Sequence, residues 1–323
     1  MPASRERDLL VKAARLYYQE NYSQQEVASA LGVGRSNVSR ILAAARAQGI
    51  VEIRINDPAG RESHLEERLQ AAFGVSACRV ASARAGEPAL ARVGELAAAW
   101  MLETVKPGNS MSLSWGRTLQ AMVRAVPSEQ DLAVEILPLV GGLSSVASEI
   151  TGEELVRELA DRLGTSYQRL HAPALLETKA SRDILMSEPP IHSVLDAGRK
   201  SSVSFVGIGA VGVGSSAAIM QSLHLSDRDR AAFEAARPVG DVCARFFDED
   251  GNPVHGAVQD RVLAVSLEDL RRIPTVVGVA AGAEKVRGVL GALRGQYVDV
   301  LVCDTTLAEA LLAEAAERST AQR

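Results

Sequence analysis

The sequence predicts an α/β protein in two parts: a small N-terminal helix-turn-helix domain and a larger C-terminal domain built on a parallel sheet. The first part follows from residues 23–55, which have the residue types and spacing of a DNA-binding helix-turn-helix. The second follows from residue 75 onward, where short apolar runs alternate with amphipathic stretches of helical period. With 323 residues, 47% of them hydrophobic and 23% charged, the chain can bury both cores.

The first element is a helix that completes a three-helix core. Between Leu9 and Tyr17 apolar residues recur at helical spacing, which predicts a supporting helix ahead of the two motif helices. After the motif, residues 50–55 alternate apolar and charged side chains, as a half-buried strand does. We therefore expect a winged helix-turn-helix.

The motif itself is defined by its packing positions. Two helices that cross steeply need a small residue at their contact, a flexible residue in the turn and an inward apolar residue, and Ala28, Gly32 and Val38 fill these positions. Ser23 followed by Glu26 forms a capping box that starts the first helix.

The second helix, expected to begin at Gly34 or Arg35, presents the chemistry of base recognition. Arginine can fork onto guanine and asparagine can pair with adenine in the major groove. The outward side chains of its first turns are Arg35, Ser36, Asn37, Ser39 and Arg40. Residues expected to hold a phosphate at the N-terminus of the first helix are Ser23, Gln24 and Gln25. The alternative is an ordinary helical hairpin whose arginines are only solvated.

The domain boundary is expected at the turn-forming segment 56–60, Asn-Asp-Pro-Ala-Gly. This gives a DNA-binding domain over residues 1–56, a linker over 57–62 and an effector-binding and oligomerisation domain over 63–323. An apolar stripe with Leu65, Leu69 and Phe73 predicts a short helix ending at Gly74. Packing of this stripe on its own domain is favoured over packing on a partner subunit.

Charge is distributed unevenly between the two parts. Residues 1–58 carry a net charge of +2, whereas the whole chain is at −5, so residues 59–323 carry −7. The asymmetry suits phosphate binding by the N-terminal part, with an acidic body that would not bind DNA by itself. Because the positive charge is modest, tight DNA binding is expected to need a dimer.

Neither export nor a metal centre is expected. The N-terminus lacks the apolar core of a signal peptide, and no stretch has the roughly 18 apolar residues of a membrane span, so we expect a cytoplasmic protein. Cys78, Cys243 and Cys303 are odd in number and far apart, which predicts buried reduced thiols and neither disulfides nor a zinc site. No cofactor is expected.

The C-terminal part has the βαβ pattern of a parallel sheet. Predicted strands cover residues 78–80, 111–113, 136–140, 203–208, 276–279 and 298–303. Predicted helices cover residues 89–105, 119–126, 153–163 and 306–318. In such a sheet a ligand binds at the carboxyl ends of the strands.

Glycine-bearing turns follow four of these strands. Their backbone N–H groups, together with neighbouring cations, suit a phosphorylated ligand. The turns contain Gly116, Arg117 and Thr118; Gly141 and Gly142; Gly207, Gly209, Gly212 and Gly214; and Ala281, Gly282 and Lys285.

The third of these turns also satisfies a dinucleotide-binding pattern. Gly207, Gly209 and Gly212 have the G-x-G-x-x-G spacing, and Asp227 and Asp229 follow about 20 residues later. That pattern normally leads through a helix to a second strand, yet residues 223–233 are predicted to be helical. A plain glycine-rich turn is therefore favoured.

Motifs spread along the whole chain resemble those of the SorC family of bacterial sugar-binding transcriptional regulators. They are residues 17–18 and 23–26, Val38-Ser39-Arg40-Ile41-Leu42, residues 46–51, Gly116-Arg117-Thr118-Leu119, Gly207-Ile208-Gly209, Gly240-Asp241-Val242-Cys243, Arg245-Phe246-Phe247-Asp248, and residues 291–295 before 299–302. The resemblance implies an effector domain similar to ribose-5-phosphate isomerase and glucosamine-6-phosphate deaminase. It also implies that this domain senses a sugar, a polyol or one of their phosphates.

The resemblance further implies which residues bind the effector. The phosphate end is expected to involve Gly116, Arg117, Thr118, Gly141, Gly142 and Lys285, and Gly207 and Gly209 are expected to contact the effector as well. Asp241 and Asp248, with Arg245 nearby, are expected at the sugar hydroxyls, since carboxylates accept hydrogen bonds from hydroxyl donors. Simpler roles are open for each: Arg245 and Asp248 pair or hold a turn, Asp241 caps a helix, and Lys285 is solvated.

Two departures from the family pattern bear on the pocket. Ala244 and Ala281 stand where the family usually has glycine, which predicts a narrower site. Leu143, Ser144 and Ser145 follow the Gly141-Gly142 turn without a lysine, so binding is expected to be noncovalent.

The predicted function is therefore effector-controlled DNA binding by a homodimer or tetramer. Operator DNA, a carbohydrate or its phosphate, and a second copy of the chain are the expected partners. The alternative is an active sugar-phosphate isomerase or deaminase that carries a DNA-binding appendage. Against it, no carboxylate and histidine pair with an acid–base arrangement is recognisable. A third interpretation, a repressor responsive to NAD through the Gly207 turn, is disfavoured.

Overall fold

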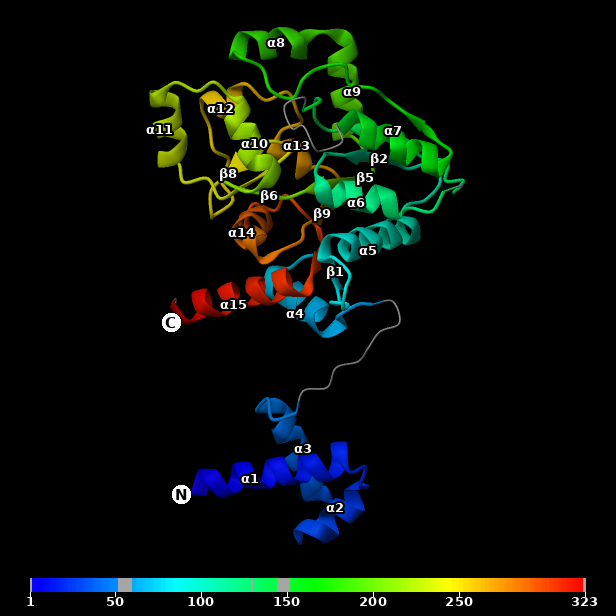
Figure 1. Cartoon of the computed structure of the whole chain (residues 1–323), viewed down its shortest axis with the longest axis vertical. Coiled ribbons are helices and arrows are strands. Elements are labelled where there is room, and N and C mark those ends of the chain that lie inside the picture. Colours follow the sequence, from blue (N-terminus) through cyan, green and yellow to red (C-terminus); the bar gives the residue numbers. More distant parts are fainter. Residues whose placement is uncertain (1, 52–59, 129, 144–151, 322–323) are drawn as a thin grey trace. The chain divides into compact units, whose positions relative to one another are not determined.

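A computed structural model describes residues 2–51, 60–128, 130–143 and 152–321 (Figure 1). The chain divides into two compact units, residues 1–56 and residues 57–323. Each unit has its own hydrophobic core.

The N-terminal unit consists of helices. Helix α1 (Pro2–Ala14) continues into a π-helical turn (Arg15–Gln19) and is followed by α2 (Gln24–Leu31) and α3 (Arg35–Ala47). The predicted supporting helix is confirmed, since its side chains share one core with those of α2 and α3: Ala13, Val27, Ala28, Val38 and Leu42.

The turn between α2 and α3 depends on two glycines. Gly32 ends α2 in a left-handed conformation with φ 65°, which glycine adopts without steric cost. Gly34 is the N-cap of α3, so the second helix begins at Arg35, as predicted. The predicted strand over residues 50–55 and its wing lie largely outside the described residues.

The C-terminal unit opens with a short helix that packs on its own body. Helix α4 (Ser63–Phe73) ends at Gly74 with φ 70°, as the apolar stripe predicted. Leu65 and Leu69 are buried in the main core. Helix α15 (Thr305–Ala321), from the other end of the unit, contacts α4 (Figure 1).

The centre of this unit is a seven-stranded sheet in which each neighbouring pair is parallel. In spatial order the strands are β1 (Ala77–Ala81), β10 (Val300–Asp304), β9 (Val276–Val279), β5 (Val203–Gly207), β2 (Ser110–Leu113), β3 (Glu135–Pro138) and β4 (Ser166–Tyr167). The six predicted strands are confirmed with small changes at their ends, whereas β4 was not predicted.

Helices cover the sheet as the βαβ pattern requires. Those that pack on its strands include α5 (Ala89–Thr104), α6 (Arg117–Ala125), α7 (Gly152–Leu163) and α9 (Pro189–Arg199). Helix α8 (Lys179–Ser187) packs on α9, and α14 (Val286–Arg294) packs on α15. Helices α5 and α6 pack directly on one another (Figure 1). Gly94 makes this approach possible, since a Cβ atom there would lie 2.5 Å from the carbonyl carbon of Ala121.

A second, antiparallel sheet was not anticipated from the sequence. Its strands β6 (Gly209–Ala210), β7 (Gly240–Val242) and β8 (Arg245–Phe247) are only two or three residues long. The remaining helices lie around it: α10 (Gly214–Ser222), α11 (Asp227–Ala235), α12 (Ala257–Asp260) and α13 (Leu267–Leu270). The helix predicted over residues 223–233 in fact begins at Asp227, because Ser226 caps it.

The order of the strands determines where a ligand can enter. From β2 the chain passes to β3 on one side and later returns to β5 on the other side. Such a reversal leaves a crevice at the carboxyl ends of the two strands, where α/β proteins bind their ligands. In the described part of the chain, no helix is both long and apolar enough to cross a membrane.

Candidate functional site

A cavity lies at the carboxyl ends of β2, β5 and β9. Its volume is about 70 Å³. The cavity is therefore narrow. Its lining comprises Leu90, Trp115, Gly116, Arg117, Thr118, Gly207, Ile208, Gly209, Gly214, Ser215, Ser216, Asp241, Ala281 and Lys285.

One side of the cavity carries groups that attract anions. Helices α6 and α10 both begin there, and neither N-cap, Gly116 or Val213, makes a side-chain capping bond. Helix N-termini direct backbone N–H groups and a partial positive charge at a ligand. The Arg117 guanidinium comes from α6 to the start of α10, since a Cβ atom on Gly214 would lie 3.6 Å from its Nη2. Lys285 adds a second cation to the lining.

The other side holds one buried carboxylate, that of Asp241 on β7. Its Oδ1 accepts a short hydrogen bond from the Ser216 hydroxyl, and its Oδ2 accepts one from the Ala244 N–H at 3.2 Å. Burial raises the pKa of Asp241 above its ordinary value, although the Ser216 hydrogen bond, the charge of Lys285 and the Ala244 N–H oppose the rise. A ligand hydroxyl donating to this carboxylate would favour its ionised form.

Glycine is required where β5 leads into the cavity. A Cβ atom on Gly209 would lie 1.9 Å from Oδ1 of Asp241 and 2.2 Å from Oγ of Ser216. A Cβ atom on Gly207 would lie 2.8 Å from the Trp115 carbonyl oxygen. These contacts within the chain account for both glycines without a dinucleotide.

The carboxylates of the dinucleotide pattern lie elsewhere. Asp227 and Asp229 are in the first turn of α11, where Asp229 accepts a 2.8 Å hydrogen bond from the Ser226 hydroxyl. Neither lines the cavity. The segment is thus a glycine-rich turn, as favoured from the sequence.

Gly141 and Gly142 were expected at the phosphate end, but they do not line the cavity. The Gly141 N–H donates to the Leu263 carbonyl at 3.0 Å, and Gly142 exchanges backbone hydrogen bonds with Ala172 and Ala174. A Cβ atom on Gly141 would lie 2.6 Å from the Ala172 carbonyl oxygen. Close backbone packing therefore explains Gly141, whereas a Cβ atom on Gly142 would meet nothing closer than the same oxygen at 4.0 Å.

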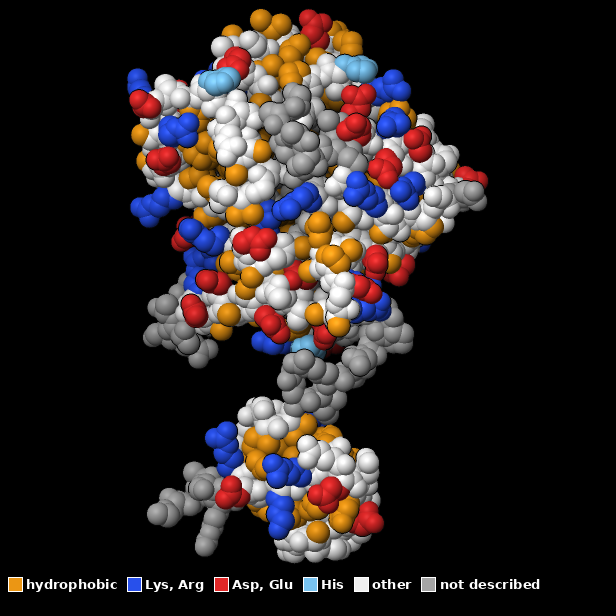
Figure 2. Space-filling model, viewed as in Figure 1, with side chains coloured by type: hydrophobic (Ala, Val, Ile, Leu, Met, Phe, Trp, Pro, Cys, Tyr) orange, Lys and Arg blue, Asp and Glu red, His pale blue; other side chains and the backbone are white. Residues whose placement is uncertain are grey.

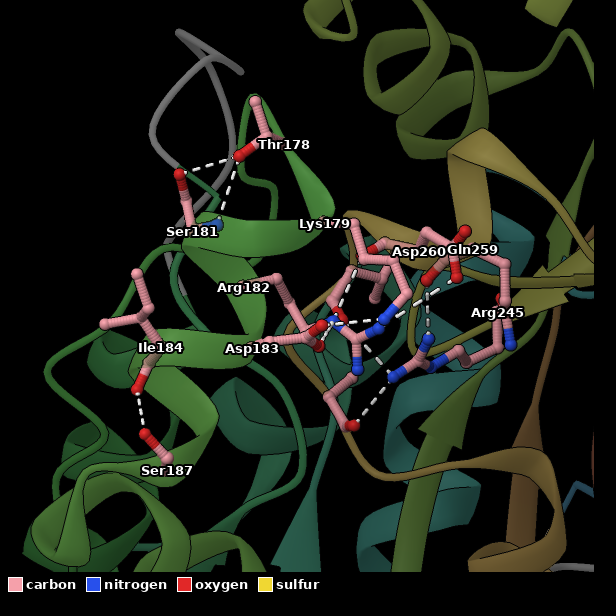
Figure 3. A network of polar contacts seen from close by, with 12 residues as sticks. Thr178, Lys179, Ser181, Arg182, Asp183, Ile184, Ser187, Arg245, Gln259 and Asp260 are labelled. Atoms are coloured by element: carbon pink, nitrogen blue, oxygen red, sulfur yellow. Dashed lines mark hydrogen bonds and ion pairs between the residues drawn. The ribbon is translucent and has the colours of Figure 1, made fainter.

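Arg245 was also expected at the effector, and its position is structural. Its guanidinium is buried and donates to the carbonyl oxygens of Gln259, Val262, Ala264 and Val265 at 2.9–3.3 Å. Figure 3 shows it directed at the Gln259 backbone. Burial lowers its pKa to about 10. This side chain joins β8 to the segment that follows α12.

Asp248 holds a turn, which was the simpler of the roles considered for it. Its Oδ1 accepts hydrogen bonds from the N–H groups of Asp250 and Asn252, at 3.0 and 2.8 Å. Its Oδ2 accepts one from Nδ2 of Asn252 at 3.1 Å. Asp248 is not part of the cavity lining, and it does not pair with Arg245.

The two alanine departures have different consequences. Ala281 lines the cavity, so its methyl group narrows the site as expected. Ala244 does not line it. It is fully buried in the turn between β7 and β8, with φ 60°, and Cys243 beside it has φ 54°. This left-handed pair positions the Ala244 N–H toward Asp241.

Three lining residues were not singled out in the sequence: Leu90, Ser215 and Ser216. Leu90 lies in the first turn of α5, next to no motif. The two serines follow Gly214 at the start of a helix, a pattern of small residues that could have indicated an anion site. The Ser216 contact with Asp241 joins residues 25 positions apart, which no local pattern reveals.

In the N-terminal unit, one face of α3 is open to solvent. Val38, Leu42 and Ala45 turn inward and are buried. The predicted base and phosphate readers are all exposed: Arg35, Ser36, Asn37, Ser39 and Arg40.

The larger unit shows a mixed distribution of charge. In Figure 2, Lys and Arg side chains on its visible face are interspersed with Asp and Glu. Positive charge is not concentrated on that face.

The start of α2 shows how Ser23 is used. Its hydroxyl accepts a hydrogen bond from the Glu26 N–H at 3.3 Å, and the Glu26 carboxylate accepts one from the Ser23 N–H at 2.8 Å. The predicted capping box is confirmed. These hydrogen bonds lower the pKa of Glu26. Gln24 is half-buried and Gln25 is exposed beside it.

Comparison with known proteins gives concordant matches. The family described as "Putative sugar-binding domain" matches residues 57–313. The deoxyribonucleoside regulator of Bacillus subtilis (strain 168) is 32% identical over 309 residues, which cover 94% of this chain and 97% of the relative. The sorbitol operon regulator of Klebsiella pneumoniae is 32% identical over 308 residues, with the same coverage of both chains.

One solved structure is similar to this chain over nearly its whole length. The full-length sorbitol operon regulator SorC from Klebsiella pneumoniae superposes with a TM-score of 0.72 at 31% identity, covering 94% of this chain and 98% of that one. These relatives are named regulators rather than enzymes. The chain belongs to the SorC family of transcriptional regulators with a sugar-binding domain.

Proposed function

We propose that this regulator binds operator DNA through α2 and α3, acting as a helix-turn-helix, and that a phosphorylated sugar or polyol in the cavity changes its operator affinity. The observation that carries the effector proposal is the pairing of two kinds of group in one narrow cavity. Two helix N-termini, Arg117 and Lys285 suit a phosphate, while the buried Asp241 suits hydroxyl donors.

The effector class follows from how the cavity is built. A phosphate group would complement the two helix N-termini, Arg117 and Lys285, and hydroxyl groups would donate hydrogen bonds to Asp241, so a ligand that carries both kinds of group matches both sides of the cavity. The similarity to ribose-5-phosphate isomerase and glucosamine-6-phosphate deaminase implied by the sequence fits this class, with the site used for sensing. Gly116, Thr118, Gly207 and Gly209 would contact the ligand through their backbone.

The DNA-binding part of the proposal rests on α3. Arg35, Asn37 and Arg40 are exposed on one short helix whose opposite side is buried. We propose that they contact base edges, and that Ser36, Ser39 and the start of α2 contact phosphates. Two half-sites read by two copies of the chain would supply the affinity that one unit with so small a net charge lacks.

The test is operator binding by fluorescence anisotropy. The DNA is taken from the region upstream of the protein's own gene, with and without a panel of free and phosphorylated pentoses, hexoses and polyols. A salt-dependent complex whose affinity changes with one phosphorylated compound is expected. A response only to unphosphorylated compounds would refute the phosphate assignment. No complex at low salt would refute the DNA-binding proposal.

Charge-neutral variants locate the site. Arg117→Gln and Lys285→Gln are each expected to weaken binding of the active phosphorylated compound by about 10-fold or more, as loss of a charged hydrogen bond does. Arg124→Gln is the matched control, because Arg124 lies exposed at the other end of α6. Equal affinities in all three variants would show that the compound binds outside the cavity.

A further inference from the structure

Residues 60–62 are hydrogen-bonded alongside the edge strand β1. The Ser82 N–H donates to the Gly60 carbonyl at 2.9 Å, the Glu62 N–H donates to the Val80 carbonyl at 2.9 Å, and Arg61 bridges Ala81 in antiparallel register. These residues follow directly on the segment that joins the two units. We call residues 60–62 the linker anchor.

The first connection from the cavity to the linker anchor runs through α5. Leu90 lines the cavity, and two residues further on Arg92 is buried with its guanidinium against Gly60. A Cβ atom on Gly60 would lie only 2.1 Å from Nη2 of Arg92. Arg92 is held in turn by a short ion pair with Glu95 and by Glu87 at 3.5 Å.

Helix α5 is also coupled to the anion side of the cavity. The backbones of α5 and α6 touch at Gly94 and Ala121, and the N-terminus of α6 is part of the anion site. A shift of α6 towards a bound anion must therefore move α5, because the contact has no room for independent motion.

The second connection runs through the end of β10. The Gly282 N–H, between the lining residues Ala281 and Lys285, donates to Oδ1 of Asp304 at 2.8 Å. The next residue, Thr305, donates its hydroxyl to the Ala81 carbonyl at 3.0 Å. Ala81 is the residue that Arg61 bridges. Three contacts therefore separate the Lys285 loop from the linker anchor.

We infer that the linker anchor is the element through which effector occupancy controls the DNA-binding unit, and that Arg92 and Thr305 are the positioning residues that couple it to the cavity. The inference rests on the proposed function, since it needs an anion in the cavity. An anion that binds between the N-termini of α6 and α10 and Lys285 displaces α5 and the Gly282 loop together. Both connections converge on Gly60 and Arg61, which hold the start of the effector domain to its edge strand.

The test is amide hydrogen exchange of the full chain, with inorganic phosphate as the probe and chloride of equal ionic strength as the reference. Phosphate is expected to slow exchange at the start of α6, residues 116–119, and also at Glu62 and Ser82, whose amides bond to β1 and to the linker anchor. Slowing at Glu62 and Ser82 by about 5-fold or more is expected, the lower end of usual allosteric couplings.

Variants separate coupling from folding. In Arg92→Gln and in Thr305→Val, phosphate should still protect residues 116–119, while the response at Glu62 and Ser82 is lost. Thr305→Ser keeps the hydroxyl and should restore the response. Thr104→Val is the matched control, because it removes a hydroxyl-to-carbonyl bond at the far end of α5, and it should behave like the unmodified protein.

The outcomes distinguish the two proposals. Protection at residues 116–119 without any change at Glu62 and Ser82 in the unmodified protein overturns the coupling inference alone. An unchanged response in both Arg92→Gln and Thr305→Val removes these residues from the coupling. Absence of protection at residues 116–119 overturns the anion site of the proposed function, and the coupling inference with it.

Discussion

At the scale of single residues, Asp241 is the buried carboxyl group that we propose binds the effector, and its burial also affects stability. Its carboxyl group is buried, so its pKa is raised and the folded protein binds its proton more tightly than the unfolded chain does. The resulting contribution to stability is complete at low pH. It is lost as the pH rises from the unfolded pKa, about 4, through the higher folded pKa. Above the folded pKa, the folded protein bears the cost of an ionised buried group.

We predict that Asp241→Asn gains in stability relative to the unmodified protein as the pH rises from about 4 to 7. Chemical denaturation at several pH values measures this difference. The same variant should bind the effector at least about 10-fold more weakly, because a hydrogen bond to a charged acceptor is lost. A stability difference that does not vary with pH would show that burial does not raise the pKa of Asp241 in the folded protein.

Gly209 is the second residue at which we expect a single substitution to disrupt the site, because there is no room for a Cβ atom. We predict that Gly209→Ala abolishes effector binding and lowers the free energy of unfolding by about 1–3 kcal/mol, as overpacking of an interior does. The cause is the 1.9 Å separation between the new Cβ atom and Oδ1 of Asp241. Isothermal titration and denaturation of the same sample provide both readouts.

Gly142→Ala is the control for this substitution. Gly142 was expected at the effector from the sequence, yet a Cβ atom there would meet nothing closer than the Ala172 carbonyl oxygen at 4.0 Å. Effector affinity should be unchanged in this variant. A loss of effector affinity equal to that in Gly209→Ala would show that Gly142 contributes to the effector site.

At the scale of elements, the capping box of α2 lies where a DNA phosphate contact is proposed, so its folding role and that contact can be tested separately. We predict that Ser23→Ala destabilises α2 by about 1 kcal/mol, seen as faster exchange of its amides in the full chain. Ser23→Asp keeps a strong N-cap residue but adds a negative charge where a DNA phosphate is expected. It should leave α2 stable and still weaken operator binding.

A matched capping box on α13, made by Ser266 and Asp269, provides the control. Ser266→Ala removes the same kind of cap from the other unit and should leave operator affinity unchanged. Unimpaired operator binding by Ser23→Asp would mean that no phosphate lies near the start of α2.

The elements also show what the sequence could predict. Helix and strand periodicity placed the central strands and most of their helices, because each is long enough to display its own pattern. The hairpin of β7 and β8 was missed, since its strands have three residues each and its turn places Cys243 and Ala244, rather than glycine or asparagine, at positive φ.

The candidate site was predictable only where its residues lie at strand ends. Gly116, Arg117, Gly207 and Lys285 were predicted because of their positions at strand ends, and all four line the cavity. Arg245 was predicted at the effector but lies outside the cavity lining. The carbonyl oxygens that surround it come from residues 259–265, and no local pattern links that segment to β8. Long-range contacts decide whether a charged residue binds a ligand or the protein itself.

At the scale of the whole molecule, DNA affinity is expected to come from pairing two weakly charged units. The first 58 residues carry a net charge of only +2 and the remainder carries −7, so the larger unit repels DNA at long range. One unit bound to one half-site would gain few phosphate contacts. Two linked units convert the second contact into an intramolecular step and can raise affinity by about 10²–10⁴-fold.

We therefore predict a strong dependence on half-site geometry. An operator with two half-sites should bind at least about 100-fold more tightly than one in which a half-site is scrambled. Inserting five base pairs between the half-sites turns them to opposite faces of the duplex, by about half a helical turn, and should cost nearly as much. Arg40→Gln should cost about 1–3 kcal/mol of operator binding per copy, as loss of a base contact does. Anisotropy titrations on the three DNAs, with sedimentation to count protein copies per duplex, measure all of this. Equal affinity for intact and scrambled operators, with one copy bound, would show that a single unit suffices and that the chain does not act as a dimer on DNA.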